Sequence, residues 1–377
     1  MKKKILLGTI IVIISILILL LVFTNINKNK DIKDQEYTIG LVSPLSGVGS
    51  QIGLAMASGM EIATKEINEN GGINGQNLNL VIEDGKINGA ESANAANFLI
   101  NTQNIDILVT LFQPPAEAIA PIAIQNNIPL IYEAYVRSIK DQSNIIFKTD
   151  FDSSSGCEEL TRFAKENNKY EKLAIVFPQI GFSEECFEGI KKVEPNVEEF
   201  WYGVEEKNYK TILLRANQKN IDTIFVLGFD YHFVNLFNQL QKYDYPIKVM
   251  AATTSEIFPK NVFENVTKES LENTLTIDFK GIDIDNSEFA KKYETFINKT
   301  NLSHTEYAYA AEGYDHVMII SKAMENCKPK DTECLVNSLE NVKGHVTVNG
   351  NTGFKDRVLQ NTNKIYEYKN GSWVQLN

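Results

Sequence analysis

Short apolar runs and helical patterns of apolar residues alternate along the chain from residue 37 onward. Apolar runs of this length are typical of buried strands, and a helical segment between two such runs supplies the crossover that parallel strands need. The first series predicts strands at 37–43, 78–83, 106–112, 130–133 and 145–149, with helices at 52–69, 89–103 and 114–127. The sequence therefore predicts an α/β fold with a doubly wound, Rossmann-like sheet.

A second series of the same kind predicts a second lobe, which a chain of 377 residues can accommodate. Its strands are expected at 173–177, 197–202, 223–229 and 248–252, with helices at 158–167, 183–192, 209–219 and 233–243. The later helices, expected at 287–298, 305–325 and 332–342, do not fit this second lobe. A hairpin with its turn at Asn370-Gly371 follows them. The pattern indicates that the chain crosses back between the lobes.

The N-terminal segment predicts a membrane helix. Three lysines, Lys2 to Lys4, precede an uncharged and nearly all apolar run from Ile5 to Phe23, which is long enough to span a bilayer. We expect residues 1–36 to be an uncleaved signal anchor and a polar linker, with the lysines inside the cell. A cleaved signal peptide remains the alternative. Either interpretation places residues 37–377 outside the cytoplasm, at the cell surface or secreted.

Four cysteines in such a compartment favour two disulfides. Cys327 and Cys334 flank a polar loop between two expected helices, and Cys157 and Cys186 lie at or in helices of one lobe. We expect these two pairings. Zinc is the alternative, but no histidine stands at ligand spacing from either pair, so no metal is expected.

Charge and motifs exclude several functions. A formal net charge of −11 without a basic stripe argues against nucleic-acid binding. The sequence lacks G-x-S-x-G, H-E-x-x-H and Walker patterns, so we expect no enzyme and no cofactor. The Gly-rich turn Ser43–Gly53 joins the first strand to the first helix, but its glycines miss the dinucleotide-binding offsets. It is interpreted as a tight turn with a ligand-facing lip.

Several segments taken together resemble the leucine/isoleucine/valine-binding family of extracytoplasmic solute receptors. They lie in order and are spread over nearly the whole length of residues 37–377: residues 37–47, 63–75, 80–84, 127–131, 147–149, 310–315 and 352–354. The resemblance implies a type I periplasmic-binding fold, in which a three-strand hinge joins two lobes that close on a ligand. It implies lobe one at 37–149 plus 278–358, and lobe two at 150–277 plus 359–377.

The resemblance also implies where the ligand binds. Family pockets for amino acids hold the α-carboxylate with Ser/Thr-rich turns and the ammonium with a carboxylate from lobe two. Here Gln113 follows the third strand, Glu133 and Tyr135 follow the fourth, and Thr253 stands where the acid is expected. These departures favour a ligand that is neutral or positively charged near lobe one, such as an amide, a polyol or a small aromatic compound. The implied lining is Ser46, Gln113, Glu133, Tyr135, Phe182, Phe229, Asp230 and Thr253.

Each of these residues has a structural alternative. Phe182 or Phe229 could belong to the core, Gln113 could cap its helix, and Glu133 could pair with a lysine or with Arg137. The function implied is a membrane-anchored solute-binding receptor, held by residues 5–23, that delivers a small molecule to an ABC transporter permease. The alternative function is the ligand-sensing ectodomain of a signalling system that acts through a partner. An exported enzyme is the third.

Overall fold

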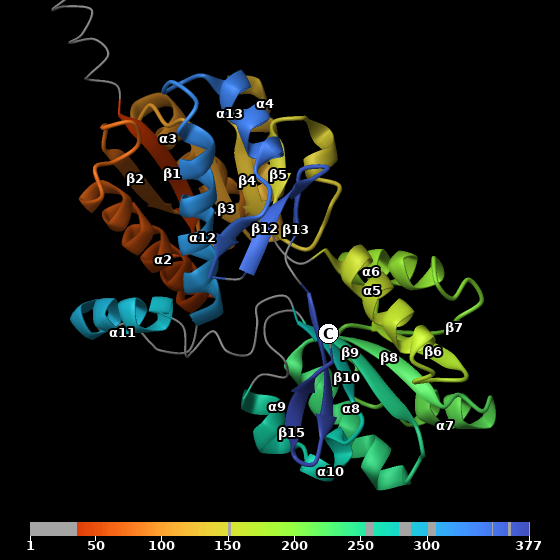
Figure 1. The fold of residues 1–377 in the computed structure, drawn as a ribbon. Helices are drawn as coiled ribbons and strands as arrows, with labels where there is room; N and C mark the ends of the chain where they lie inside the picture. The colour runs from red at the N-terminus through yellow and green to blue at the C-terminus, as the bar shows by residue number, and fades with distance from the viewer. Residues whose placement is uncertain are drawn as a thin grey trace, which may run out of the picture.

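The computed structural model describes residues 36–149, 152–253, 260–278, 288–300, 307–348, 350–360 and 363–376. They form two α/β lobes, each built on one mixed sheet with helices packed against it (Figure 1). The two-lobe architecture predicted from the alternating pattern is confirmed.

Lobe one contains the sheet ordered β11-β12-β13-β5-β4-β3-β1-β2. The first five strands of the chain pair in parallel, and β13 adds to β5 in parallel before the antiparallel pairs β13–β12 and β12–β11. The strands are β1 (Tyr37–Ser43), β2 (Leu78–Asp84), β3 (Ile107–Leu111), β4 (Leu130–Glu133), β5 (Ile146–Lys148), β11 (His345–Thr347), β12 (Gly350–Lys355) and β13 (Val358–Gln360).

Helices from an early part of the chain and from a later part cover this sheet. They are α2 (Ser50–Glu69), α3 (Gly89–Thr102), α4 (Gln113–Asn126), α11 (Glu288–Thr300), α12 (Tyr307–Met324) and α13 (Thr332–Asn341), with a short 3-10 helix, η1 (Lys140–Gln142). Helices α2 and α12 pack closely against each other. A Cβ atom on Gly59 would lie 1.8 Å from the Ala310 carbonyl oxygen, and one on Gly313 would lie 2.1 Å from the Met56 carbonyl oxygen. Glycine at both positions therefore lets the two backbones touch.

Lobe two contains the sheet ordered β15-β14-β10-β9-β8-β6-β7. Strands β6 to β10 pair in parallel, while the C-terminal hairpin β14–β15 adds in antiparallel fashion to β10. The strands are β6 (Leu173–Pro178), β7 (Glu198–Tyr202), β8 (Thr223–Gly228), β9 (Lys248–Thr253), β10 (Leu275–Asp278), β14 (Lys364–Lys369) and β15 (Ser372–Gln375). The helices are α5 (Ser153–Glu166), α6 (Gly181–Lys191), α7 (Lys210–Gln218), α8 (Asp230–Tyr243), α9 (Lys260–Asn265) and α10 (Lys268–Leu271).

The chain passes between the two lobes three times. It does so between β5 and α5, between β10 and α11, and between β13 and β14. Helix α11 lies beside α2 in lobe one, although the strand before it belongs to lobe two (Figure 1). Each lobe is therefore assembled from separate parts of the sequence.

Both expected disulfides are present. Cys157–Cys186 joins α5 to α6 in lobe two, and Cys327–Cys334 joins the end of α12 to the start of α13 in lobe one. A Cβ atom on Gly189 would lie 2.0 Å from the Ser154 carbonyl oxygen, so α5 and α6 also approach closely through their backbones.

The predicted membrane segment, residues 5–23, lies outside the described residues. Within the described ranges, no helix combines the length and the apolar character that crossing a bilayer requires.

Candidate ligand-binding site at the interlobe junction

Aromatic side chains from both lobes meet at the carboxyl ends of three strands. Ligand sites of open α/β sheets gather at this edge. Tyr135 follows β4 in lobe one, Phe182 opens α6 after β6, and Phe229 follows β8. The ring centroids of Tyr135 and Phe182 are 5.1 Å apart, and those of Phe182 and Phe229 are 6.1 Å apart. Tyr231 stacks on Phe229 at 6.1 Å and completes what we call the aromatic row: Tyr135, Phe182, Phe229 and Tyr231.

The members of the aromatic row differ in burial. Phe182 is 9% exposed and belongs to an apolar cluster of lobe two, so its core alternative holds in part. Phe229 is 38% exposed although it is a large apolar side chain. Exposed apolar surface of this kind at a strand end is suited to contact with a ligand.

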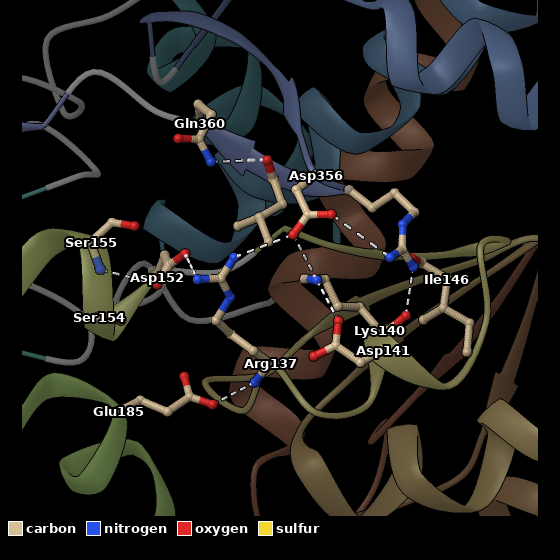
Figure 2. A network of polar contacts seen from close by, with 12 residues as sticks. Arg137, Lys140, Asp141, Ile146, Asp152, Ser154, Ser155, Glu185, Asp356 and Gln360 are labelled. Atoms are coloured by element: carbon tan, nitrogen blue, oxygen red, sulfur yellow. Dashed lines mark hydrogen bonds and ion pairs between the residues drawn. The ribbon is translucent and has the colours of Figure 1, made fainter. Parts of the chain in front are cut away.

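Arg137, two residues after Tyr135, contacts residues of both lobes (Figure 2). Its backbone N–H donates to Glu185 Oε1 on α6 at 2.7 Å. Its guanidinium lies 3.4 Å from Asp152 Oδ2 in lobe two and 3.9 Å from Asp356 Oδ2 in lobe one. Arg137 was one possible partner of Glu133 from the sequence, whereas the structure places its guanidinium between these two aspartates.

The acidic partners of Arg137 are themselves held in place. Asp152 Oδ1 accepts the Ser155 N–H at the start of α5, at 3.2 Å. Asp356 Oδ2 accepts from the buried Lys140 ammonium at 3.1 Å, and this hydrogen bond holds the pKa of Asp356 below its usual range. Burial raises the pKa of Glu185. The contacts of Arg137, Asp152, Asp356 and Glu185 are called the interlobe bridge.

The other predicted residues of lobe one lie at the same edge of the sheet but contact their own neighbours. The Ser46 hydroxyl donates to Asp84 Oδ2 at 2.5 Å, and the Gln113 amide donates to Glu117 Oε1 at 2.8 Å. Both side chains are exposed. Glu133 ends β4 and is only 4% exposed.

The β3–α4 turn carries backbone strain next to Gln113. Phe112 adopts φ 68° and ψ 151°, a region that costs a non-glycine residue on the order of 1–3 kcal/mol. Its N–H donates to the Glu133 carbonyl oxygen at 2.8 Å. This contact fixes the ends of β3 and β4 against each other.

Two predicted residues of lobe two are described through their backbone alone. Asp230 begins α8 and Thr253 ends β9, in register with Gly228. Asp230 and Thr253 therefore lie at the same edge of the sheet as Phe229, because α8 begins there and β9 ends there. Their side chains lie outside the described part of the structure.

Sequence reasoning missed the interlobe bridge and the residues around Phe229. Asp152 stands in the polar stretch before α5, where an acidic residue is a signal for a helix N-cap. Asp356, Glu185 and His232 come from three distant segments and carry no local signal. Pairing Arg137 with Asp356 and Glu185, or His232 with Phe229, requires knowledge of the fold.

Comparison with known proteins agrees with this geometry. Residues 36–372 match the model of the family described as periplasmic binding protein. The Leu/Ile/Val-binding protein of Escherichia coli K12 is 26% identical over 216 residues, which cover 55% of this chain and 57% of the relative. The Leu/Ile/Val/Thr-binding protein of Salmonella typhimurium LT2 is 24% identical over 200 residues, covering 51% and 54%. The matched part thus spans a little over half the length of these curated relatives.

Solved structures share the fold over nearly the whole described chain. A leucine-binding protein from Thermotoga maritima MSB8 superposes with a TM-score of 0.68 at 19% identity, covering 90% of this chain and 98% of the other. A solute-binding protein of an ABC transporter from R. palustris, in complex with 4-hydroxybenzoate, gives 0.70 at 18% identity, covering 91% and 96%. The resemblance noted in the sequence is confirmed. The chain belongs to the periplasmic binding protein family.

Proposed function

We propose that this protein is an extracytoplasmic solute-binding receptor that encloses a small molecule between its lobes and delivers it to an ABC importer. The observation that carries the proposal is the aromatic row, because Tyr135 of lobe one contacts Phe182 of lobe two, which in turn contacts Phe229, at the strand ends. Membership of the family supports binding and transport in place of catalysis.

The hinge of the receptor consists of the three passages between the lobes. The bounds proposed for the lobes are those that the resemblance implies, 37–149 plus 278–358 for lobe one and 150–277 plus 359–377 for lobe two, except that β10 keeps Asp278 in lobe two and β13 keeps residues 359 and 360 in lobe one. Movement about the three passages would separate Tyr135 from Phe182 and stretch the interlobe bridge. Ligand binding would favour the arrangement in which both sets of contacts are made.

The proposed ligand is a small molecule with a flat or apolar body and no free carboxylate facing lobe one. The aromatic row offers ring faces and edges to an apolar body. The buried Glu133 at the end of β4 disfavours an anion beside it and favours an amide or a cationic group. Among similar structures one is a complex with isoleucine and one is a complex with 4-hydroxybenzoate, so this fold accepts both kinds of apolar body.

The location proposed is the outer face of a membrane, with residues 5–23 as anchor. Two disulfides support an oxidising compartment, because cytosolic proteins rarely keep structural disulfides. Analysis of the N-terminus of the purified natural protein distinguishes a retained anchor from a cleaved signal peptide.

Ligand screening of the full-length protein in detergent tests the proposal. Native mass spectrometry before and after unfolding and refolding detects a carried ligand, and thermal shift ranks amino acids, amides, polyols and aromatic acids. A ligand at about 100 times its dissociation constant adds about 2.7 kcal/mol, which raises the melting temperature by several degrees. The compound is expected to be recovered unchanged.

Three outcomes decide between the alternatives. An aromatic amide or similar compound that shifts melting more than leucine does supports the proposed ligand class. A larger shift with leucine or valine contradicts that class but keeps the receptor function. Conversion of a bound compound into a product contradicts the receptor function itself.

A further inference from the structure

His232 lies directly behind Phe229 and is buried. It is the third residue of α8, and none of its surface is exposed. Phe229 is the residue between Gly228, which ends β8, and Asp230, which begins α8. The imidazole therefore lies at the junction of β8 and α8.

Two hydrogen bonds fix the state of the imidazole. The Phe229 backbone N–H, which can only donate, lies 3.0 Å from His232 Nδ1. The Val204 carbonyl oxygen, which can only accept, lies 2.8 Å from Nε2. His232 is therefore neutral with its proton on Nε2. His232 occupies position N3 of α8, and a side chain at N3 can accept a hydrogen bond from the backbone N–H of the N-cap residue, here Phe229.

The Val204 carbonyl ties a second element to this turn. It also accepts from the Tyr231 hydroxyl at 2.7 Å, so two neighbouring side chains of α8 hold the segment that links β7 to α7. The Tyr231 and His232 rings are 4.2 Å apart, and the Tyr202 ring of β7 lies 5.3 Å from His232. A Cβ atom on Gly228 would be 2.4 Å from His232 Nδ1. The imidazole therefore has one position available.

We propose that His232 is a positioning residue: by holding the Phe229 N–H and the Val204 carbonyl, it sets the orientation in which Phe229 meets the ligand. The proposal rests on the proposed function, because Phe229 must contact the ligand for its orientation to matter. Glycine at position 228 is part of the same arrangement, since any side chain there displaces the imidazole.

The arrangement makes ligand binding sensitive to acid. Protonation places a proton on Nδ1, so His232 no longer accepts the Phe229 N–H. Burial lowers the pKa of His232 from its ordinary value of 6.5, although the hydrogen bond to the Val204 carbonyl and the charge of Glu205 oppose this. The other titratable groups packed nearby within the described residues are Tyr202, Tyr209 and Tyr231, and burial raises the pKa of each of these phenols. The imidazole thus dominates the response to acid.

The sign of the pH effect follows from the lowered pKa. Neutral His232 contributes fully at pH values above 6.5, its unfolded value. The contribution falls as the pH drops below that value and is lost at the lower folded pKa. Within the folded protein, His232 is protonated as the pH falls through its lowered pKa, so Phe229 orientation, and with it ligand affinity, is expected to weaken only below pH 6.5.

The test uses the full-length protein and three variants. His232→Phe keeps a ring but removes both hydrogen bonds, and His232→Gln restores an acceptor for the Phe229 N–H. His345→Gln, on β11 of lobe one, is the matched control. Ligand affinity is measured from about pH 8 to about pH 5. Histidine side-chain nitrogen NMR reports the tautomer of His232, and amide exchange reports the Phe229 N–H.

The expected results are specific. His232→Phe weakens ligand binding about tenfold and speeds Phe229 amide exchange. His232→Gln binds the ligand within about threefold of wild type. The fall of affinity that protonation of His232 causes is lost in His232→Gln, whereas His345→Gln keeps it. Comparing these two variants removes the contribution of carboxylates such as Glu185.

Several outcomes overturn the proposal. A resonance that places the proton on Nδ1 at neutral pH does so, and so does unchanged Phe229 amide exchange in His232→Phe. Equal pH profiles for His232→Gln and His345→Gln also overturn it. If no compound binds at all, the proposed function fails, whereas the tautomer and amide exchange still decide whether His232 holds Phe229.

Discussion

Phe229 exposes an apolar ring at the interlobe junction, and Phe98 on α3 exposes one elsewhere on lobe one. The two residues are 38% and 42% exposed, so replacing either removes a similar area of exposed apolar surface. Phe229 alone belongs to the aromatic row.

Phe229→Ala is expected to weaken ligand binding at least tenfold, because an aromatic contact with a ligand contributes roughly 1–3 kcal/mol. Phe98→Ala is the control and should leave affinity unchanged. Isothermal titration with the ligand from the screen measures both. Equal affinity in Phe229→Ala and wild type would place the ligand away from the aromatic row.

Individual site residues could be predicted only where they follow a strand. Tyr135, Phe182 and Phe229 each stand just after a recognisable apolar run, and the structure brings these three together. The contribution of each to ligand binding stays a prediction. The interlobe bridge could not be predicted, because Arg137, Asp152 and Asp356 become neighbours only when two lobes and a hairpin turn are in place.

At the scale of elements, the sequence predicted most strands and helices to within a few residues. The strand expected at 37–43 is β1 with the same bounds. Helix α5 begins at Ser153, five residues before the expected 158, because Asp152 caps a run of serines that have weak helix propensity. The short strands β11 to β13 were not predicted, since runs of three to six residues with several glycines carry little pattern.

The two disulfides close loops of different length in the sequence, so they are expected to contribute differently to stability. Cys157 and Cys186 are 29 residues apart, and Cys327 and Cys334 are 7 apart. The loop-entropy relation gives about 3.6 kcal/mol for the longer loop and about 2.4 kcal/mol for the shorter one.

Replacing each pair by serines is therefore expected to lower the free energy of unfolding more for Cys157/Cys186 than for Cys327/Cys334. Urea denaturation of the two double variants, followed by circular dichroism, measures the difference. A larger loss for the Cys327/Cys334 pair would mean that local packing of α12 with α13 outweighs loop entropy.

At the scale of the whole molecule, the interlobe bridge predicts how the lobes are held without a ligand. Arg137→Gln removes the guanidinium but leaves the backbone N–H to Glu185 in place. The bridge is partly exposed, so its contribution is about 1 kcal/mol or less, enough to change the population of a separated arrangement several-fold.

Small-angle X-ray scattering should therefore give a larger radius of gyration for Arg137→Gln than for wild type. Arg162→Gln is the control, because Arg162 pairs within α5 with Glu158, which is not part of the bridge. An unchanged radius in Arg137→Gln would show that the other contacts between the lobes suffice.

The three passages between the lobes also determine when the protein can fold during its synthesis. Lobe one needs β12 and β13 beside β5, and lobe two needs β14 beside β10, so both sheets wait for strands from the last part of the chain. Ribosomes release the N-terminal part first, and domains fold as units once their residues are present. An emerging chain thus holds no finished lobe until β13 and β14 have been made, long after the other parallel strands of both sheets have left the ribosome.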